Sequence, residues 1–238
     1  MPRRTQKPTS DELVRELPAY TIADAAHYLG VPPTTLRSWV HGRSYDTSDG
    51  IRRFKPIIKA AGSGVASLSF INLVEAYVLD AIRRRHKVRL DKVRVAVAYL
   101  EREFGTQHPL AAAKMMTDGC ELFIHYLDRL IVVSQDGQLA MKEMLDAYLK
   151  RIEWSPDGFA RRFYPFVRGE ALDQPMLVVV DPTVSFGRPT LRGTGIPTSI
   201  IAERHKAGES IAELAANYAR ETAEIEEAIR CEIRSKAA

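Results

Sequence analysis

Short hydroxyl and cationic side chains are gathered between residues 33 and 55, and their types could do the chemistry of phosphate and base recognition. Hydroxyl, imidazole and guanidinium groups donate hydrogen bonds to phosphate oxygens and to base edges in the grooves of a duplex. This segment is therefore a candidate DNA-contacting surface. The candidate residues are Thr34, Thr35, Arg37, Ser38, His41, Arg43, Arg52, Arg53 and Lys55.

Three arginines near the other end of the chain could do a second kind of chemistry, the pairing of a cation with carboxylates of a protein partner. They are Arg188, Arg192 and Arg204. A guanidinium offers a fixed fork of donors and cannot be deprotonated at physiological pH. Ordinary surface charge explains each of the three equally well, so their role depends on where the fold places them.

The first group needs a helix to carry it, and residues 19 to 41 have the pattern of two helices joined by a short turn. Thr21 and Asp24 form a capping box at the start of the first helix, and Gly30 is suited to end it. Pro33 is suited to the first turn of the second helix. The pattern predicts a helix-turn-helix whose hydroxyls and cations point outward, although a solvated helical hairpin can show it too.

Residues 42 to 69 place four glycines beside five basic residues, with apolar residues between them, which is typical of a basic β-wing. Such a wing can neutralise backbone phosphates next to a recognition helix. Two amphipathic helices are expected to follow, capped by Ser69 and split at residues 88 to 90. The run Arg83-Arg84-Arg85 in the first of them could reach DNA, or could only complement the helix dipole.

The middle block, residues 106 to 170, is the least informative part of the chain. The stretch ELFIHYLDRLIVVSQ alternates in a way that predicts strands, Gly137 punctuates it, and QLAMKEMLDAYLKRI predicts a helix. Strands are expected to resume at residues 159 to 167. We expect this block to serve as a scaffold and as a dimerisation region.

Residues 187 to 218 combine a glycine-punctuated turn with two helices joined by Gly208. Ser210 and Glu213 form a second capping box. The apolar face expected for a third helix consists of Ile225, Ala228, Ile229 and Ile233. The pattern indicates a compact helical binding module.

The segment from Asp181 to Ile233 resembles a small bacterial domain family whose signature runs D-P, G-R-P, R-G-T-x-I-P and A-G-x-S-x-x-E-L, and every one of these elements is present. Gly195 departs from the arginine usual at its position, and Ala219-Arg220-Glu221 replaces a glycine-containing turn. Stand-alone members are typically paired with PIN-like nuclease toxins. The resemblance therefore implies an antitoxin role, with the three C-terminal arginines as candidate toxin contacts.

The N-terminal half resembles MerR-type winged helix-turn-helix proteins, without the long effector-binding coiled coil of that family. The whole chain is similar to long-form VapB-type antitoxins of bacterial type II toxin–antitoxin pairs. This resemblance implies two partners, a PIN-like ribonuclease toxin and double-stranded operator DNA. A homodimer is expected, because one helix-turn-helix per chain would then give two recognition helices on a pseudo-palindromic operator.

An autonomous winged-helix transcriptional regulator is the main alternative, in which the C-terminal module is a second helix-turn-helix and no toxin exists. An oligomeric adaptor is a third possibility, which steep, salt-dependent binding to duplex DNA would exclude. The adjacent reading frame separates the first two, because a small cotranscribed protein with several spaced carboxylates favours the antitoxin.

We therefore expect a predominantly helical α+β fold with a winged helix-turn-helix, a β-containing connector and a C-terminal β-turn plus three-helix module. The expected divisions are a lead-in at residues 1–18, the DNA-binding domain at 19–105, the connector at 106–170 and the C-terminal module at 171–238.

Charge and motif content narrow the function class. Residues 1–105 hold 18 Lys/Arg against 11 Asp/Glu, a net +7, whereas residues 106–238 hold 16 against 19, a net −3, so the half expected to face a polyanion is N-terminal. Cys120 and Cys231 match no metal or redox spacing, and neither a signal peptide nor a membrane span is indicated, so we expect a cytoplasmic protein. P-loop, GxSxG, HExxH and dinucleotide-binding motifs do not occur, and we expect no enzyme activity, cofactor or metal.

Overall fold

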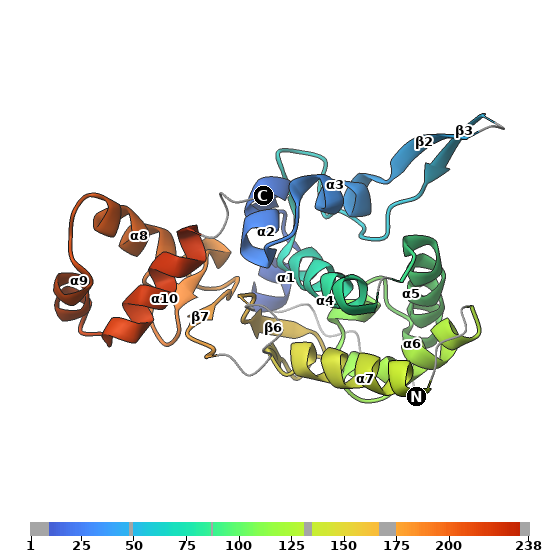
Figure 1. Ribbon diagram of the computed structural model, residues 1–238. Helices are drawn as coiled ribbons and strands as arrows, with labels where there is room; N and C mark the ends of the chain where they lie inside the picture. The colour runs from blue at the N-terminus through green and yellow to red at the C-terminus, as the bar shows by residue number, and fades with distance from the viewer. Residues whose placement is uncertain (1–9, 48–49, 87, 131–134, 167–174, 234–238) are drawn as a thin grey trace.

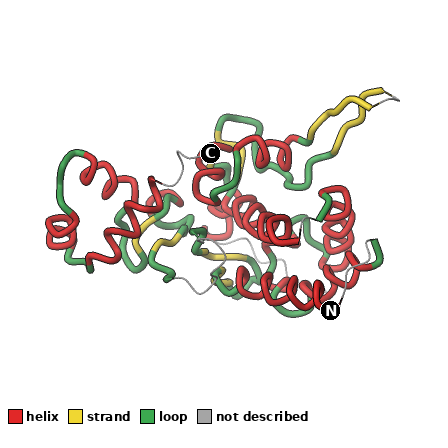
Figure 2. The backbone as a smooth tube through the Cα atoms, in the orientation of Figure 1, coloured by secondary structure: helices red, strands yellow, loops and turns green. Residues whose placement is uncertain are grey.

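The structure is a computed structural model that describes residues 10–47, 50–86, 88–130, 135–166 and 175–233. Helices make up most of these residues, and their strands form four two-stranded antiparallel sheets. Figure 2 shows the helices spread across the whole molecule and one long hairpin projecting from it. None of the described helices is both long and apolar enough to cross a membrane. The expected predominantly helical α+β class is confirmed.

The N-terminal part forms the expected helix-turn-helix. Its elements are α1 (Ser10–Glu16), β1 (Tyr20–Thr21), α2 (Ile22–Leu29) and α3 (Pro33–His41). The backbone N–H of Asp24 donates to Thr21 Oγ1 at 3.0 Å, so the predicted capping box begins α2. Gly30 ends α2 in the left-handed conformation, and Pro33 is the first residue of α3.

A β-hairpin follows α3 and projects from the body as the expected wing (Figure 1). Its strands are β2 (Arg43–Thr47) and β3 (Gly50–Phe54), and β4 (Ala66–Leu68) then returns to pair with β1. The two helices predicted next are α4 (Phe70–His86) and α5 (Leu90–Phe104). Ser69 Oγ accepts from the backbone N–H of Asn72 at 3.2 Å, as expected for a residue that caps α4.

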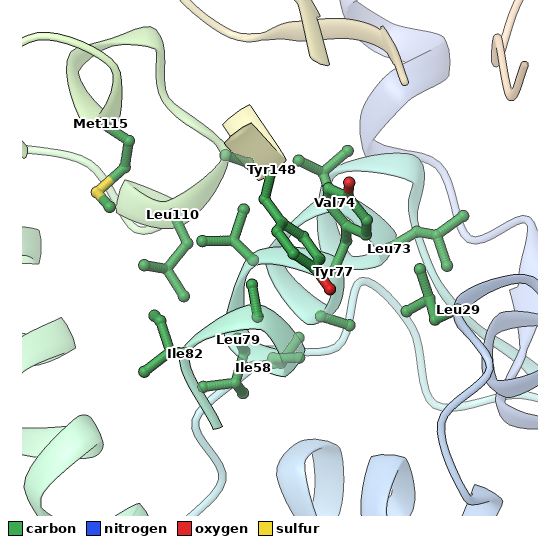
Figure 3. Packing of buried hydrophobic residues seen from close by; sticks show 14 of the residues in the cluster. Leu29, Ile58, Leu73, Val74, Tyr77, Leu79, Ile82, Leu110, Met115 and Tyr148 are labelled. Carbon is green, nitrogen blue, oxygen red and sulfur yellow. The ribbon is translucent and has the colours of Figure 1, made fainter. Parts of the chain in front are cut away.

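Helix α4 lies at the centre of the larger hydrophobic core. Apolar side chains surround it, which is the pattern of a helix buried on all sides. Figure 3 shows Tyr77 of α4 beside Tyr148 of the middle block, and their ring centroids are 5.1 Å apart. The same core contains Leu29 of α2 and Ile58, which follows the wing. Helix α4 is thus the scaffold that joins the helix-turn-helix to the middle block, and the core runs across the expected division at residue 105.

The middle block is mainly helical, which corrects one expectation. Its elements are η1 (Pro109–Ala111), η2 (Ala113–Met115), α6 (Gly119–Asp128), α7 (Gln135–Leu149), β5 (Ile152–Trp154) and β6 (Ala160–Phe163). The prediction of strands in ELFIHYLDRLIVVSQ is wrong, because α6 covers its first half; residues 131–134 lie outside the described part. The buried face of α6 follows the helical spacing i, i+3, i+4, i+7 at Cys120, Phe123, Ile124 and Leu127.

Two other expectations for this block are confirmed. Helix α7 lies where a helix was predicted, and β6 falls within the predicted strand region. Gly137, expected to punctuate the sequence, lies inside α7 near its start.

The C-terminal module has its own smaller core. Its elements are β7 (Val178–Val179), η3 (Ser185–Gly187), β8 (Thr190–Leu191), α8 (Thr198–Lys206), α9 (Ile211–Tyr218) and α10 (Thr222–Ile233). The core is built mainly from Leu191, Ile201, Leu214, Ile225, Ala228 and Ile229. The predicted capping box of Ser210 and Glu213 begins α9. Ile233, expected on the buried face of α10, is instead 66% exposed.

Candidate nucleic-acid interface

Helix α3 presents hydroxyl and cationic side chains because apolar residues hold its other face against the core. The residues of that buried face, each at most 4% exposed, are Leu36, Trp39 and Val40. The outward residues are Thr34, Arg37 and His41, which are exposed, and Thr35 and Ser38, which are half-buried. Ser38 Oγ donates to the Thr35 carbonyl at 2.7 Å, which leaves the oxygen lone pairs of Ser38 available as acceptors.

The register of the wing decides which of its candidates share a face. Arg43 lies opposite Phe54, whereas Arg53 lies opposite Ser44. Side chains alternate between the faces of a strand and opposed residues share a face, so Arg53 and Arg43 point to opposite faces of the wing. Gly42 joins α3 to the wing at φ +75°, and a Cβ there would collide with the carbonyl oxygen of Phe54. The base of the wing therefore sits directly against the end of α3.

A groove of about 560 Å³ opens between α3 and the base of the wing. Its lining consists of Thr34, Thr35, Arg37, Ser38, Gly42, Arg43, Phe54, Arg83 and Leu90. The structure thus brings five of the nine predicted DNA-contacting residues together. Three other predicted residues, His41, Arg53 and Lys55, are exposed but do not line the groove. The side chain of Arg52 lies outside the described residues.

Arg83 is the groove residue that the sequence had left undecided. Its guanidinium carbon lies 5.8 Å from the centroid of the Trp39 ring on α3. The side chains of Arg84 and Arg85 lie outside the described residues. The run of three arginines was the available signal, and Arg83 is the member of that run whose side chain the structure describes.

The wing is anchored to the body by a buried polar network that the sequence analysis did not identify. The Trp39 carbonyl accepts from the backbone N–H of Ile58 at 3.1 Å. Asn72, fully buried on α4, accepts from the N–H of Ala61 at 3.0 Å and donates to the carbonyl of Lys59 at 2.9 Å. These bonds satisfy the backbone of the segment that returns from the wing. The one available signal was an asparagine within an apolar helix.

A buried acid lies next to Asn72 and extends this network. Glu75 Oε2 accepts from Asn72 Nδ2 at 3.2 Å and lies 3.1 Å from Nδ1 of His108. Burial raises the pKa of Glu75, and the nearby His108 imidazole and the hydrogen bond from Asn72 oppose that rise. Burial lowers the pKa of His108, but the Glu75 carboxylate at 3.1 Å outweighs that effect, so the pKa of His108 is raised. The pair therefore links α4 to the start of the middle block.

The three C-terminal arginines differ in how they are held. Arg204 Nε donates to Glu209 Oε1 at 2.6 Å, its Nη2 contacts the other carboxylate oxygen, and its guanidinium lies 5.0 Å from the Tyr218 ring centroid. Arg192 is exposed, with its guanidinium 5.6 Å from the ring centroid of Tyr164. Arg188 is exposed as well, and no hydrogen bond or ion pair holds its guanidinium within the described part of the chain. Arg188 is thus the freest of the three.

Arg188 also lies close to the helix-turn-helix. Burial raises the pKa of Tyr28, on α2, to about 12, the charges of Asp24 and Glu232 add to the rise, and the positive charge of Arg188 opposes it. The Gly187 carbonyl, next to Arg188, accepts from the Tyr20 hydroxyl at 3.0 Å, and Tyr28 packs against the core of the C-terminal module. The C-terminal module therefore meets the helix-turn-helix domain beside Arg188.

Two family models match the chain at separate places. Residues 18–97 match the family described as "Putative DNA-binding HTH domain", which includes α2, α3, the wing and α4. Residues 178–230 match the family described as "Protein of unknown function (DUF433)", which covers most of the C-terminal module. The groove thus lies inside the helix-turn-helix match.

Similarity to other proteins extends over most of the chain. It is 30% identical over 223 residues to "Putative antitoxin VapB45" of Mycobacterium tuberculosis (strain ATCC 25618 / H37Rv), which covers 87% of this chain and 90% of that protein. It is 23% identical over 219 residues to "Uncharacterized protein Rv2308" of the same organism, covering 88% of each. The crystal structure of Rv2018 from Mycobacterium tuberculosis matches with a TM-score of 0.70 and 27% identity, covering 90% of this chain and 97% of that chain. The likeness therefore includes the helix-turn-helix, the middle block and the C-terminal module together.

Proposed function

This chain belongs to the VapB-type antitoxin family and carries a DNA-binding helix-turn-helix domain, and on this basis we propose that it neutralises a PIN-like ribonuclease toxin and represses its own operon. The two activities fall to different parts of the chain. The helix-turn-helix and wing bind operator DNA, and the C-terminal module binds the toxin.

The groove between α3 and the wing is the observation that carries the DNA-binding half of the proposal. It gathers hydroxyls from α3 with the cations Arg37 and Arg43 on one concave surface. Arginine can bond two acceptors of a guanine edge, and short hydroxyls suit phosphates and bases alike. The excess of basic residues in the N-terminal half supplies the sequence-independent attraction. We assign α3 to the major groove and the wing to the adjacent backbone, with a homodimer on two half-sites.

The toxin-binding half rests on family membership and on the free guanidinium of Arg188. PIN-like nucleases gather carboxylates and Mg²⁺ in their active sites, and an arginine can pair with such carboxylates through two parallel hydrogen bonds. Arg188 is exposed and uncommitted, whereas Arg204 already pairs with Glu209. We therefore assign the main toxin contact to Arg188, with Arg192 as a second contact and Arg204 as a structural residue.

Co-purification with the product of the neighbouring reading frame tests both halves. The two proteins are expressed together with one tag, and the complex is assayed for ribonuclease activity before and after denaturing separation. Recovery of activity by the refolded partner alone, and its loss on adding the chain back, is the expected result. Binding of the complex to the duplex upstream of the genes is measured in the same preparation.

The outcome distinguishes the antitoxin from an autonomous regulator. A chain that binds the upstream duplex tightly but leaves the activity of the neighbouring protein unchanged is a regulator without a toxin. A chain that neutralises the ribonuclease but binds the duplex no better than random DNA is an antitoxin without operon control.

A further inference from the structure

Two arginines of the α4–α5 pair lie against the two elements that form the DNA-binding groove. The guanidinium carbon of Arg83, on α4, is 5.8 Å from the ring centroid of Trp39 on α3. That of Arg94, on α5, is 5.4 Å from the ring centroid of Phe54 on the wing. Both distances are within the range of cation–π attraction.

Neither guanidinium is held mainly by hydrogen bonds. Within the described residues, the buried Nε of Arg83 and the buried Nε and Nη2 of Arg94 have no hydrogen-bond partner. A buried donor without an acceptor is destabilising. At these two positions the contact with the aromatic ring is the interaction that offsets this cost. Burial also lowers the pKa of Arg94, although the nearby negative charge of Asp91 acts to raise it.

The two rings lie where the DNA-reading elements join the body. Trp39 is 1% exposed near the end of α3, and its carbonyl accepts from the segment that returns from the wing. Phe54 is the last residue of the wing, and its carbonyl abuts Gly42. A small rotation at Phe54 is amplified along the hairpin, because the wing projects freely beyond it (Figure 1).

We propose that Arg94 and Arg83 are positioning residues for DNA binding, and that the α4–α5 pair sets the angle between wing and recognition helix through their contacts with Phe54 and Trp39. The proposal rests on the proposed operator binding. Arg94 does not line the groove, and its Nε and Nη2 are buried, so these donors cannot meet a phosphate. Arg83 lies in the groove lining with Trp39 beneath it, where it supports α3.

The first test separates positioning from direct phosphate contact. A duplex is selected from random sequence by the wild-type chain, and the affinities of R94M, R94K and R102M are measured over a range of salt concentrations. We expect R94M to lower affinity roughly tenfold and R94K to retain most of it, because an ammonium also attracts a ring face. The salt slope should stay unchanged, whereas loss of a phosphate contact would reduce it by about 0.9. Arg102 is exposed on the same helix, so R102M is the matched control.

The second test measures the wing angle directly. Spin labels on I51C in the wing and A98C on α5 report the distance between them, and the native cysteines, Cys120 and Cys231, are both buried. We expect a narrow distance distribution for the wild type and R94K, and a broad one for R94M. F54L removes the ring and keeps the apolar bulk, so it should broaden the distribution in the same way without touching an arginine.

The results that would overturn the proposal differ from those that would overturn DNA binding. An unchanged distance distribution in both R94M and F54L refutes the positioning role, as does a reduced salt slope with unchanged distances. Failure of the wild-type chain to select any duplex refutes operator binding itself.

Discussion

The Nε2 atom of His27, on the first helix of the helix-turn-helix, lies 3.3 Å from Oε2 of Glu232, on the last helix of the chain. The other oxygen of Glu232 accepts from Thr198 Oγ1 at 2.5 Å. Tyr28, next to His27, packs against both hydrophobic cores. The toxin-binding module of the proposal is thus docked directly on the DNA-binding domain.

Replacing Glu232 by Gln should weaken the fold in a pH-dependent way. Burial raises the pKa of Glu232, but hydrogen bonds from His27 and Thr198 outweigh it and hold the pKa below the ordinary 4.5. The carboxylate therefore stabilises the fold above about pH 4.5, and that contribution is lost as the pH falls through the lower, folded-state pKa. Near neutral pH, E232Q should cost about 1.5–3 kcal/mol, as expected for a hydrogen bond to a charged group.

Urea unfolding of wild type and E232Q over a series of pH values measures this effect. The difference in free energy of unfolding should shrink as the pH falls below about 4.5. E226Q is the control, because Glu226 is an exposed carboxylate on the same helix. A difference in free energy of unfolding that stays constant with pH would contradict the stabilising role of the Glu232 carboxylate.

Gly187→Ala should destabilise the chain more than Gly193→Ala. Both glycines have similar positive φ angles, 74° and 75°, so both substitutions carry the left-handed strain of about 1–2 kcal/mol. At Gly187 a Cβ would also collide with the Tyr20 hydroxyl, which donates to the Gly187 carbonyl at 3.0 Å, whereas at Gly193 it would meet nothing within 4 Å. We expect G187A to cost about 2 kcal/mol more than G193A in thermal or urea unfolding. The double variant G187A/Y20F should lose less free energy of unfolding than the two single variants together. Strictly additive losses would argue against a clash between the Cβ introduced at position 187 and the Tyr20 hydroxyl.

Arg37→Ala should reduce sequence discrimination. Arg37 is exposed on α3 and lines the groove, so a bidentate contact with a base is the expected role. The loss should be about 1–3 kcal/mol on the selected operator and much smaller on random duplex. Fluorescence anisotropy with both duplexes in one buffer measures the ratio. An equal loss on both would place Arg37 on the backbone.

Arg43→Ala and Arg53→Ala remove the same charge from opposite faces of the wing. Arg43 lines the groove, so its loss should reduce the slope of log affinity against log salt by about 0.9. Loss of the Arg53 charge should reduce this slope less, because Arg53 points to the other face of the wing. Equal reductions would mean that the wing inserts into the duplex with both faces in contact.

Arg188→Glu should abolish toxin binding without unfolding the chain, because Arg188 is exposed and uncommitted. Arg204→Ala should instead lower the stability of the module, since it breaks the contacts with Glu209 and Tyr218, and should leave toxin affinity nearly unchanged. Calorimetric titration with the purified toxin, alongside thermal unfolding, separates the two effects. Loss of toxin affinity only in R204A would reverse the assignment.

The local signals of the sequence were reliable wherever they depended on neighbouring residues. The capping boxes at Thr21 and Ser210, the end of α2 at Gly30 and the start of α3 at Pro33 follow from hydrogen bonds and backbone angles within one turn. The wing was predictable from its glycines and from the basic and apolar residues between them. The failure at α6 arose because apolar and aromatic residues satisfied a two-residue alternation and a helical period together, and only packing against α5 and α7 decides between them.

The sequence by itself determined the helical framework, the hydroxyl and cationic face of α3, the basic wing and the resemblance to VapB-type antitoxins. The tertiary structure alone decided that Arg43 and not Arg53 faces the groove, that Arg83 lines it, and that Arg204 is already paired. It also decided that His27 meets Glu232 across 205 positions of the chain. The physical reason is that capping and periodicity act over a few residues, whereas strand register, side-chain pairing and docking depend on surfaces that only the packed chain brings together.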